Sequence, residues 1–276
     1  MDRLCTLAVG ICGAGHSGST LLGLVLGSHS SCFYAGEAKK SRFVGDASKP
    51  LRKRVCKICG EDCAIWSRFV PPGEPDLYEA LARLTGKPVI VDSTKDVEWI
   101  RSRREESPRH RLLYLVRDGR AVINSRARKY KRHDARELVD EWIEQIEATE
   151  ALVAAAPQET LRVRYEQLAT EPEATVREVC AFLELPFEPE MLRYEAHAHH
   201  PLGGNTGTQS VVARVASTLR TLAEVPERSR TYYESIRGGF RLDLRWKEEL
   251  SPELLRLFEE RAGSLNEPFR WEPVST

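Results

Sequence analysis

The sequence predicts an α/β fold with a mainly parallel central sheet and helices on both of its faces. Three observations lead to this fold class. Short runs of aliphatic and β-branched residues, of the length expected for buried strands, alternate along the chain with segments whose apolar residues recur at helical spacing. The first such run ends in glycines and leads straight into a helical pattern. The 276 residues, 41% of them hydrophobic, suffice for one core and are close to the length of single α/β domains.

The N-terminal part predicts two strands and two helices. Residues 4–12 are aliphatic and β-branched and end in glycines, which indicates a buried strand. A glycine loop at 13–18 follows, and the leucines of 19–28 share one face of a predicted helix. Residues 77–84 predict a short helix and 88–92 a second buried strand.

The middle of the chain continues this alternation. Residues 111–116 predict a third strand, and 120–131 the helix after it. The clearest helix is 138–153, where apolar residues recur at i, i+3, i+4 and i+7. A fourth strand is expected at 161–165 and an amphipathic helix at 173–185.

The C-terminal part begins with a glycine-containing loop at 197–210, and residues 211–233 are expected to be helical at both ends. Ser251 should cap the last helix, with Pro252 at its first position. Because strands and helices alternate, the strands should be parallel and joined by helical connections.

We expect a single domain over residues 1–276, with an excursion at about 30–75 that has no clear period and carries basic and cysteine clusters. The longest uncharged apolar run, 4–15, is too short to cross a bilayer, so no membrane span is predicted. No signal-peptide cleavage pattern follows it. We therefore expect the chain to start at its mature N-terminus and to act in the cytoplasm.

Charge is balanced overall but segregated along the chain. The 41 basic and 41 acidic residues cancel, which argues against a nucleic-acid coat protein. Residues 39–57 hold eight basic residues and one acidic, 101–133 twelve and three, and 134–195 five and sixteen. Solvated helix faces are the first interpretation of this segregation, and a positive cleft for a polyanionic ligand is the second.

The glycine loop and the helix start after it form the first candidate site. Backbone amides of such a loop converge on one point, the helix N-terminus adds a positive dipole, and hydroxyls add donors, which together suit a phosphate. A P-loop would require Lys where His16 stands. The weaker alternative is a tight turn that only packs a helix on a strand. The residues singled out are Gly15, His16, Ser17, Gly18, Ser19 and Thr20.

The second candidate site pairs Arg117, at a strand end, with Ser125, two helical turns later. The guanidinium fork and the hydroxyl can converge on one phosphate. For this segment alone, an ion pair between Arg117 and Asp118, with Ser125 packing the helix, explains the pattern equally well.

Taken together, the two segments resemble those of the PAPS-dependent sulfotransferases. In that family a loop similar to [R/K]-S-G-[T/S]-[T/S] holds the 5′-phosphosulfate, and an R-D-x-R-x-x-x-x-S stretch holds the 3′-phosphate; residues 16–22 and 117–125 match them. Residues 163–168 are similar to the family's v-r-Y-E-d-L strand end, and 200–205 to the h-x-x-G-G-N loop of bacterial members. The segment around Trp246 is similar to the start of their C-terminal helix.

The resemblance covers roughly residues 6–271. It implies a P-loop-like three-layer α/β/α fold, PAPS as co-substrate and transfer of a sulfuryl group to a hydroxyl of an acceptor, with no catalytic metal and no nucleic acid as partner. It also assigns Gly203, Gly204 and Asn205 to donor binding.

The resemblance gives a meaning to Glu37 in the Gly36-Glu37 pair. Relatives such as the tyrosylprotein sulfotransferases carry a G-E pair here, and its glutamate is their general base. Sulfuryl transfer needs such a base because the attacking hydroxyl must lose its proton. The alternative is a salt bridge from Glu37 to Lys39 or Lys40.

His16 departs from the family pattern, which has Lys or Arg there to bind the bridging oxygen of the leaving group. An imidazole can donate the same bond, and a neighbouring phosphate would favour its cationic form. Lys95, just after the second strand, is the other candidate cation, since strand ends face the ligand crevice in open α/β sheets. The alternative for Lys95 is an ordinary surface lysine.

The number of cysteines, seven, is odd, and the chain is too long to need disulfides for stability, so we do not expect a secreted disulfide scaffold. Cys5, Cys12 and Cys180 lie in apolar patterns and are expected in the core. A cluster of three further cysteines, Cys56, Cys59 and Cys63, has three interpretations. It is a zinc site that His29 or Cys32 would have to close, a redox pair, or a structural element of a loop near the acceptor pocket. We favour the third and assign no metal; His197, His199 and His200 are expected in the donor-binding loop.

The sequence therefore predicts a PAPS-dependent sulfotransferase with Glu37, His16 and Lys95 as catalytic residues. The rivals are a P-loop-type kinase, for which Asp92 is the only plausible Mg²⁺ ligand, and a nucleotide-binding relative without catalysis. A solvated face is the first interpretation of the basic run 39–57, and a preference for an anionic acceptor is the second. The acceptor's identity and the oligomeric state do not follow from the sequence.

Overall fold

The computed structural model describes residues 6–71, 77–107, 109–130, 134–215, 222–223, 225, 227–236 and 239–272. Its centre is a five-stranded sheet in the order β2-β3-β1-β4-β5, and every neighbouring pair of strands is parallel. The mainly parallel sheet predicted from the sequence is therefore confirmed. The strands are β1 (Leu7–Cys12), β2 (Cys32–Gly36), β3 (Val89–Asp92), β4 (His110–Val116) and β5 (Thr160–Arg164).

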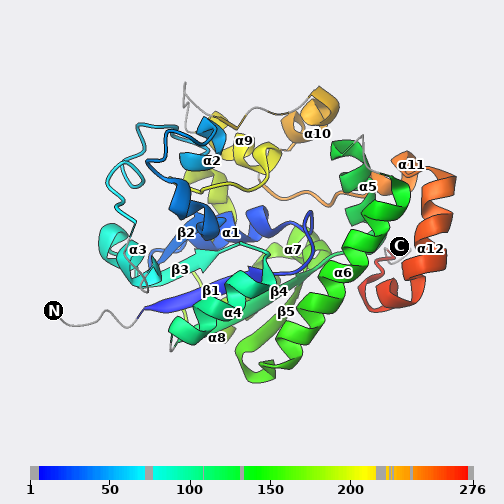
Figure 1. Cartoon of the computed structure of the whole chain (residues 1–276), viewed down its shortest axis with the longest axis horizontal. Coiled ribbons are helices and arrows are strands. Elements are labelled where there is room, and N and C mark those ends of the chain that lie inside the picture. Colours follow the sequence, from blue (N-terminus) through cyan, green and yellow to red (C-terminus); the bar gives the residue numbers. More distant parts are fainter. Residues whose placement is uncertain are drawn as a thin grey trace.

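Helices and short 3-10 segments connect the strands (Figure 1). The α-helices are α1 (Ser19–Gly27), α2 (Leu51–Arg54), α3 (Leu77–Thr85), α4 (Val97–Glu106), α5 (Gly119–Lys129), α6 (Ala135–Ala154), α7 (Tyr165–Thr170), α8 (Pro172–Phe182), α9 (Thr206–Val215), α10 (Arg230–Glu234), α11 (Trp246–Glu249) and α12 (Pro252–Asn266). The 3-10 segments are η1 (Ala38–Phe43), η2 (Pro157–Glu159), η3 (Pro189–Ala196), η4 (Glu227–Ser229) and η5 (Glu267–Phe269).

The side chains of β4 divide between two apolar cores, which shows that both sheet faces are covered. Leu113 and Leu115 join the core beneath α1, α7 and α8. Leu112, Tyr114 and Val116 join the other, which α5, α6 and α12 cover. Alternate residues of a strand point to opposite faces, so this division is what a three-layer α/β/α arrangement requires. Figure 1 shows α6 and α12 together on one side of the sheet.

Several elements differ from the sequence prediction, including β2, α4 and α9; the short helices α2 and α7 were also not expected. Cys32–Gly36 was assigned to the excursion, yet it forms the edge strand β2, fully buried beside β3. Helix α4 was missed because only Ile100 and Arg103 are buried in a mostly charged segment, which leaves little apolar period. Helix α9 starts at Thr206, inside the predicted loop.

The other expectations hold within the described residues. Helices α9 and α10 provide the two helical ends expected in 211–233, although 216–221 lie outside the described residues. Ser251 caps α12 by accepting a hydrogen bond from the amide of Leu254. Cys12 and Cys180 are buried, while Cys5 lies outside the described part. None of the helices in that part is both long and apolar enough to cross a membrane.

Candidate active site

All five parallel strands end at one edge of the sheet, and each delivers a candidate residue there. The glycine loop follows β1, Glu37 follows β2, Lys95 lies three residues after β3, Arg117 follows β4 and Tyr165 follows β5. These residues line one cavity of about 320 Å³. The cavity also includes every other site residue predicted from the sequence except Ser17 and Gly203, which adjoin it in the chain.

The glycine loop turns sharply because three of its residues, Gly13, His16 and Gly18, have positive φ angles. His16 has φ 73° and Gly18 has φ 97°. A side chain at Gly18 would come within 2.6 Å of the Tyr165 ring, so only glycine fits there. The amide of Gly15 donates to Gln145 Oε1 (2.9 Å), which also accepts from Arg126, and this anchors the loop to α5 and α6.

The start of α1 is suited to an anion. Gly18 occupies its N-cap and provides no side-chain hydrogen bond. The first amides of a helix have no partner within the helix, and they carry the positive end of its dipole. The buried hydroxyls of Ser19 and Thr20 lie at the same end.

His16 joins the two predicted phosphate sites. Its Nδ1 lies 2.8 Å from the hydroxyl of Ser125, and its ring meets the edge of Tyr130. Burial and the charges of Lys129 and Arg126 lower the pKa of His16 to about 3. The imidazole of the free protein is therefore neutral at neutral pH, so only negative charge brought by a ligand would favour the imidazolium proposed from the sequence.

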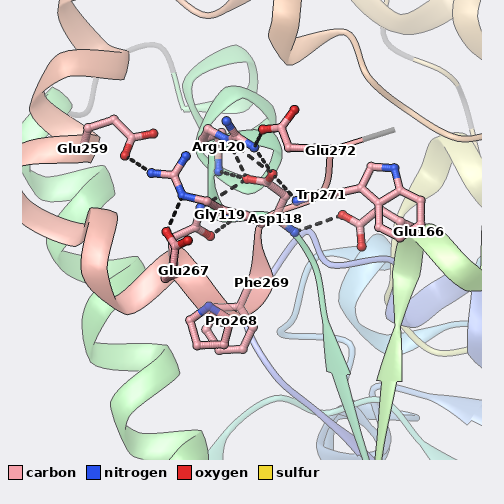
Figure 2. Close-up of polar contacts among 12 residues, drawn as sticks. Asp118, Gly119, Arg120, Glu166, Glu259, Glu267, Pro268, Phe269, Trp271 and Glu272 are labelled. Atoms are coloured by element: carbon pink, nitrogen blue, oxygen red, sulfur yellow. Dashed lines mark hydrogen bonds and ion pairs between the residues drawn. The ribbon is translucent and has the colours of Figure 1, made fainter. Parts of the chain in front are cut away.

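Arg117 and Asp118 do not pair with each other, which removes the alternative left open for this segment. Asp118 instead binds the guanidinium and amide of Arg120 and accepts the amide of Trp271 (3.0 Å), while its own amide donates to Glu166 (Figure 2). The carboxylate thus ties the end of β4 to the C-terminal segment, and the arginine before it is left to face the cavity.

Arg117 is buried and held from several directions. Its guanidinium donates to the carbonyls of His16 (3.0 Å) and Asp243 (3.1 Å) and lies 4.3 Å above the centre of the Tyr165 ring. Within the described residues its Nε has no hydrogen-bond partner. A buried donor left unpaired is costly, so this atom indicates a ligand with acceptor oxygens.

Glu37 forms the ion pair with Lys40 that was the alternative to a catalytic role (2.5 Å), but it also faces the cavity. Its Oε1 accepts the amide of Gly204 (3.2 Å). Burial alone would raise the pKa of Glu37, but Lys95 and Lys40 outweigh it and the net shift is downward. The carboxylate is consequently ionised and able to accept a proton at neutral pH.

Lys95 is no ordinary surface lysine. Its ammonium group donates to the hydroxyl of Ser19 (3.1 Å) and to the carbonyl of Ser93 (2.8 Å). Burial lowers the pKa of Lys95, while the charges of Glu37 and Asp92 act in the opposite direction. The structure therefore brings a second cation to the helix start beside His16.

The loop at 200–205 is attached to the edge of the sheet. Leu202 forms a short parallel bridge with Gly36, the last residue of the edge strand β2. Gly203 and Gly204 then adopt φ 74° and 92°, where a side chain would collide with Glu37 or approach Thr20. The amide of Asn205 donates to Thr20 Oγ1 (2.9 Å), so this loop closes over the start of α1.

Several lining residues were not found from the sequence. Six lysines and arginines and two carboxylates face the cavity, which gives it a net positive charge. Arg128 and Lys129 follow Ser125 on the same helix and belong to the basic segment noticed there; Tyr232, Tyr233, Arg241 and Arg245 come from a segment with no recognisable motif. The charged residues are Lys95, Arg117, Arg128, Lys129, Arg241, Arg245, Glu37 and Asp243.

A second cavity of about 530 Å³ adjoins the first and shares Gly15, Glu37 and Lys95 with it. Part of the basic run lies here, because β2 and η1 carry it to the carboxyl edge of the sheet. The basic residues at this cavity are Lys39, Lys40, Arg42, Lys53 and Lys95.

The cysteine cluster lies apart from both cavities, and its fourth polar neighbour is neither His29 nor Cys32. His200 approaches it instead, with Nδ1 at 3.3 Å from Cys59 Sγ and 3.4 Å from Cys63 Sγ. His29 is bound to the carbonyl of Pro186, and Cys32 lies inside β2.

The fold and the site define an α/β protein with a cationic cavity, suited to phosphate, at the carboxyl edge of a parallel sheet. The model of the sulfotransferase family matches residues 9–189, and the chain therefore belongs to the sulfotransferase family. The family resemblance seen in the sequence is thereby confirmed.

Known relatives agree with this membership. The chain is 31% identical over 99 residues to protein-tyrosine sulfotransferase A of Caenorhabditis elegans, which covers 33% of this chain and 26% of that protein. It is 30% identical over 103 residues to the Drosophila melanogaster protein-tyrosine sulfotransferase, covering 35% and 21%. The match thus spans about a quarter of these relatives' lengths.

Solved structures share the fold. The sulfotransferase domain of the Synechococcus olefin synthase superposes with a TM-score of 0.58 at 18% identity, covering 93% of this chain and 94% of that one. The sulfotransferase domain of the curacin biosynthetic pathway superposes with a TM-score of 0.56 at 20% sequence identity, and the match covers 96% of this chain and 98% of that one. A mouse sulfotransferase complexed with PAP superposes with a TM-score of 0.52 at 11% sequence identity, and the match covers 97% of this chain and 88% of that one.

Proposed function

We propose that this protein transfers a sulfuryl group from PAPS to a hydroxyl of an acceptor and releases adenosine 3′,5′-bisphosphate. The observation that carries the proposal is the position of Glu37. It borders both cavities, so a base stands where a donor in one cavity would meet an acceptor in the other.

The residues of the first cavity fit the donor. The uncapped start of α1, with Ser19 and Thr20, would hold the 5′-phosphosulfate, and Arg117 with Ser125 would hold the 3′-phosphate. The unpaired Nε of Arg117 supports this use, as does the close approach that Gly203 and Gly204 permit. A structural neighbour was solved with PAP bound, and the fold is shared.

The chemistry is an in-line displacement at sulfur. Glu37 takes the proton of the acceptor hydroxyl as the new S–O bond forms, and the bond between sulfur and the bridging oxygen breaks. His16 and Lys95 lie at the helix start, where negative charge develops on that oxygen and on the sulfuryl oxygens. Donors placed there stabilise the transition state more than the ground state.

The acceptor is proposed to carry negative charge close to its hydroxyl. Five lysines and arginines line the second cavity against two carboxylates, Glu37 and Asp96. The relatives named above are protein-tyrosine sulfotransferases, so a tyrosine within an acidic peptide belongs among the candidate acceptors.

The structure does not favour the kinase alternative, because its proposed Mg²⁺ ligand, Asp92, is already occupied by hydrogen bonds. Asp92 is buried and already accepts hydrogen bonds from Tyr78, Trp99 and the backbone amides of Ala38 and Thr94. These donors leave little room for Mg²⁺ coordination.

The test is mass spectrometry of products after incubation with PAPS and a library of neutral and acidic hydroxyl compounds, including tyrosine peptides. We expect sulfated products from PAPS in buffer without Mg²⁺. We expect no phosphorylated products when ATP replaces PAPS. Phosphorylated products that require Mg²⁺ would establish the kinase, and nucleotide binding without any product would establish the non-catalytic relative.

The expectations of a single domain and of a cytoplasmic location stay predictions.

A further inference from the structure

We propose that Cys56, Cys59, Cys63 and His200 form a structural zinc site that joins the excursion to the loop at 200–205. The four ligand atoms, three thiol sulfurs and one imidazole nitrogen, all lie within 4.8 Å of one another. Cys56 and Cys63 are fully buried, and Cys59 and His200 are partly so.

The distances fit a tetrahedral ion. Bonds of about 2.3 Å to sulfur and 2.0–2.1 Å to nitrogen place neighbouring ligand atoms roughly 3.6–3.8 Å apart at the tetrahedral angle. His200 Nδ1 lies 3.3 Å from Cys59 Sγ and 3.4 Å from Cys63 Sγ. These two distances differ from the tetrahedral values by only a few tenths of an ångström, and three Cys with one His is a ligand set of structural zinc sites.

The local backbone also suits thiolates. The segment from Cys56 turns back at Gly60, which has φ 72° and whose amide donates to the carbonyl of Cys56. This turn brings the amide of Cys59 to 3.4 Å from Cys56 Sγ, where it can donate to a negatively charged sulfur.

The site would fix two segments that lie far apart in the sequence. Trp66 Nε1 donates to the carbonyl of His200 (2.5 Å), and the amide of Lys57 donates to that of Pro201 (3.0 Å). His200 lies four residues before Gly204, whose amide binds Glu37. A metal at this point would therefore hold the loop that closes over the start of α1.

A disulfide explains the cluster less well. It would use two of the three thiols and give no role to the histidine that points at them. The chemistry of the donor set thus favours zinc over a redox pair, and no other component is needed.

The test is the metal content of the full-length protein, purified without chelators or a histidine tag. Elemental analysis should find one zinc per chain in the wild type, and replacement by Co²⁺ should give the optical bands of a tetrahedral thiolate site. Cys59→Ser and His200→Ala should lose the metal. The matched controls Cys180→Ser and His197→Ala, outside the cluster, should retain it.

Absence of zinc from the wild type together with no Co²⁺ spectrum would overturn the proposal, as would full zinc content in both ligand variants. If those variants do not fold, X-ray absorption of the wild type decides, with three sulfurs and one nitrogen expected at zinc. An intact mass lower by two hydrogens without reductant would instead establish a disulfide. None of these measurements uses nucleotide, so the zinc site and the sulfotransferase activity can fail separately.

Discussion

The imidazole of His16 and the hydroxyl of Ser125 share a hydrogen bond of 2.8 Å across 109 positions of sequence. One residue belongs to the loop after β1 and the other to α5 after β4, strands that are neighbours in the sheet. Their contact places both predicted phosphate sites in a single cavity. It also means that a change at either residue alters the hydrogen bonding of the other.

Arg117 should be required for donor binding. Arg117→Ala should cost about 2–4 kcal/mol of affinity for adenosine 3′,5′-bisphosphate, the range for truncating a buried charge-assisted contact. Calorimetric titration measures this loss. Arg177→Ala, which removes an exposed arginine on α8, is the control and should leave the affinity unchanged. Equal affinity of the two variants would remove the second phosphate site.

Glu37 should act as the general base. Glu37→Gln keeps the size and hydrogen-bonding capacity of the side chain but cannot take a proton, so kcat should fall about 10²–10⁴-fold while donor affinity stays nearly intact. Steady-state kinetics with PAPS, beside a titration of adenosine 3′,5′-bisphosphate, separates these effects. A folded variant with normal turnover would show that another residue is the base.

Lys40 should set the pH at which Glu37 works. Its charge is one of those that lower the pKa of this carboxyl. Lys40→Met removes a positive charge that favours the carboxylate, so the pKa of Glu37 should rise and the acid limb of the kcat profile should move to higher pH. If the limb stays where it is in the wild type, it does not report Glu37.

His16 and Lys95 should divide the stabilisation of the leaving group. His16→Ala should lower kcat while donor still binds, and His16→Lys, which restores the family's charge, should retain substantial activity. Lys95→Ala should also lower kcat, with Lys49→Ala at an exposed position as control. If His16→Ala turns over normally and only Lys95→Ala is slow, His16 is a packing residue.

The protonation of His16 can be followed directly. Burial and nearby cations hold its pKa at about 3 in the free protein, and bound phosphates should raise it. If the imidazolium is the working form, turnover should decline once pH rises above this raised value. Histidine resonances titrated by NMR with and without adenosine 3′,5′-bisphosphate check the shift, and an unchanged pKa would leave Lys95 as the cation.

Asp118 should matter for stability more than for chemistry. Asp118→Ala removes the acceptor for two backbone amides and leaves the exposed Glu272 as the carboxylate partner of Arg120 among the described residues, which should cost about 3–5 kcal/mol of unfolding free energy. Asp140→Ala, which breaks the exposed pair with Arg261, should cost under about 1 kcal/mol. Urea denaturation compares them, and similar small losses would mean that Asp118 is not a structural hub.

Much of the site was predictable from the sequence because it depends on local patterns. The glycine loop, Arg117 and Ser125 each belong to a strand end and the helix after it, and such a unit carries its own hydrophobic period and glycine spacing. Helix α4 and strand β2 were missed because the first is mostly charged and the second, with the sequence CFYAG, contains no β-branched residue.

The sequence by itself determined the parallel α/β fold, the position of the candidate phosphate-binding loop and the family. Only the tertiary structure decided that Arg117 faces the cavity instead of pairing with Asp118, and that Glu37 borders two cavities. It also decided that His200 contacts cysteines at least 137 positions away in the sequence. Strand and helix periods arise from neighbours along the chain, so they are visible in it. Contacts between loops depend on where the sheet edge places the ends of the loops. A local sequence pattern contains no information about that placement, so these contacts could not be predicted from it.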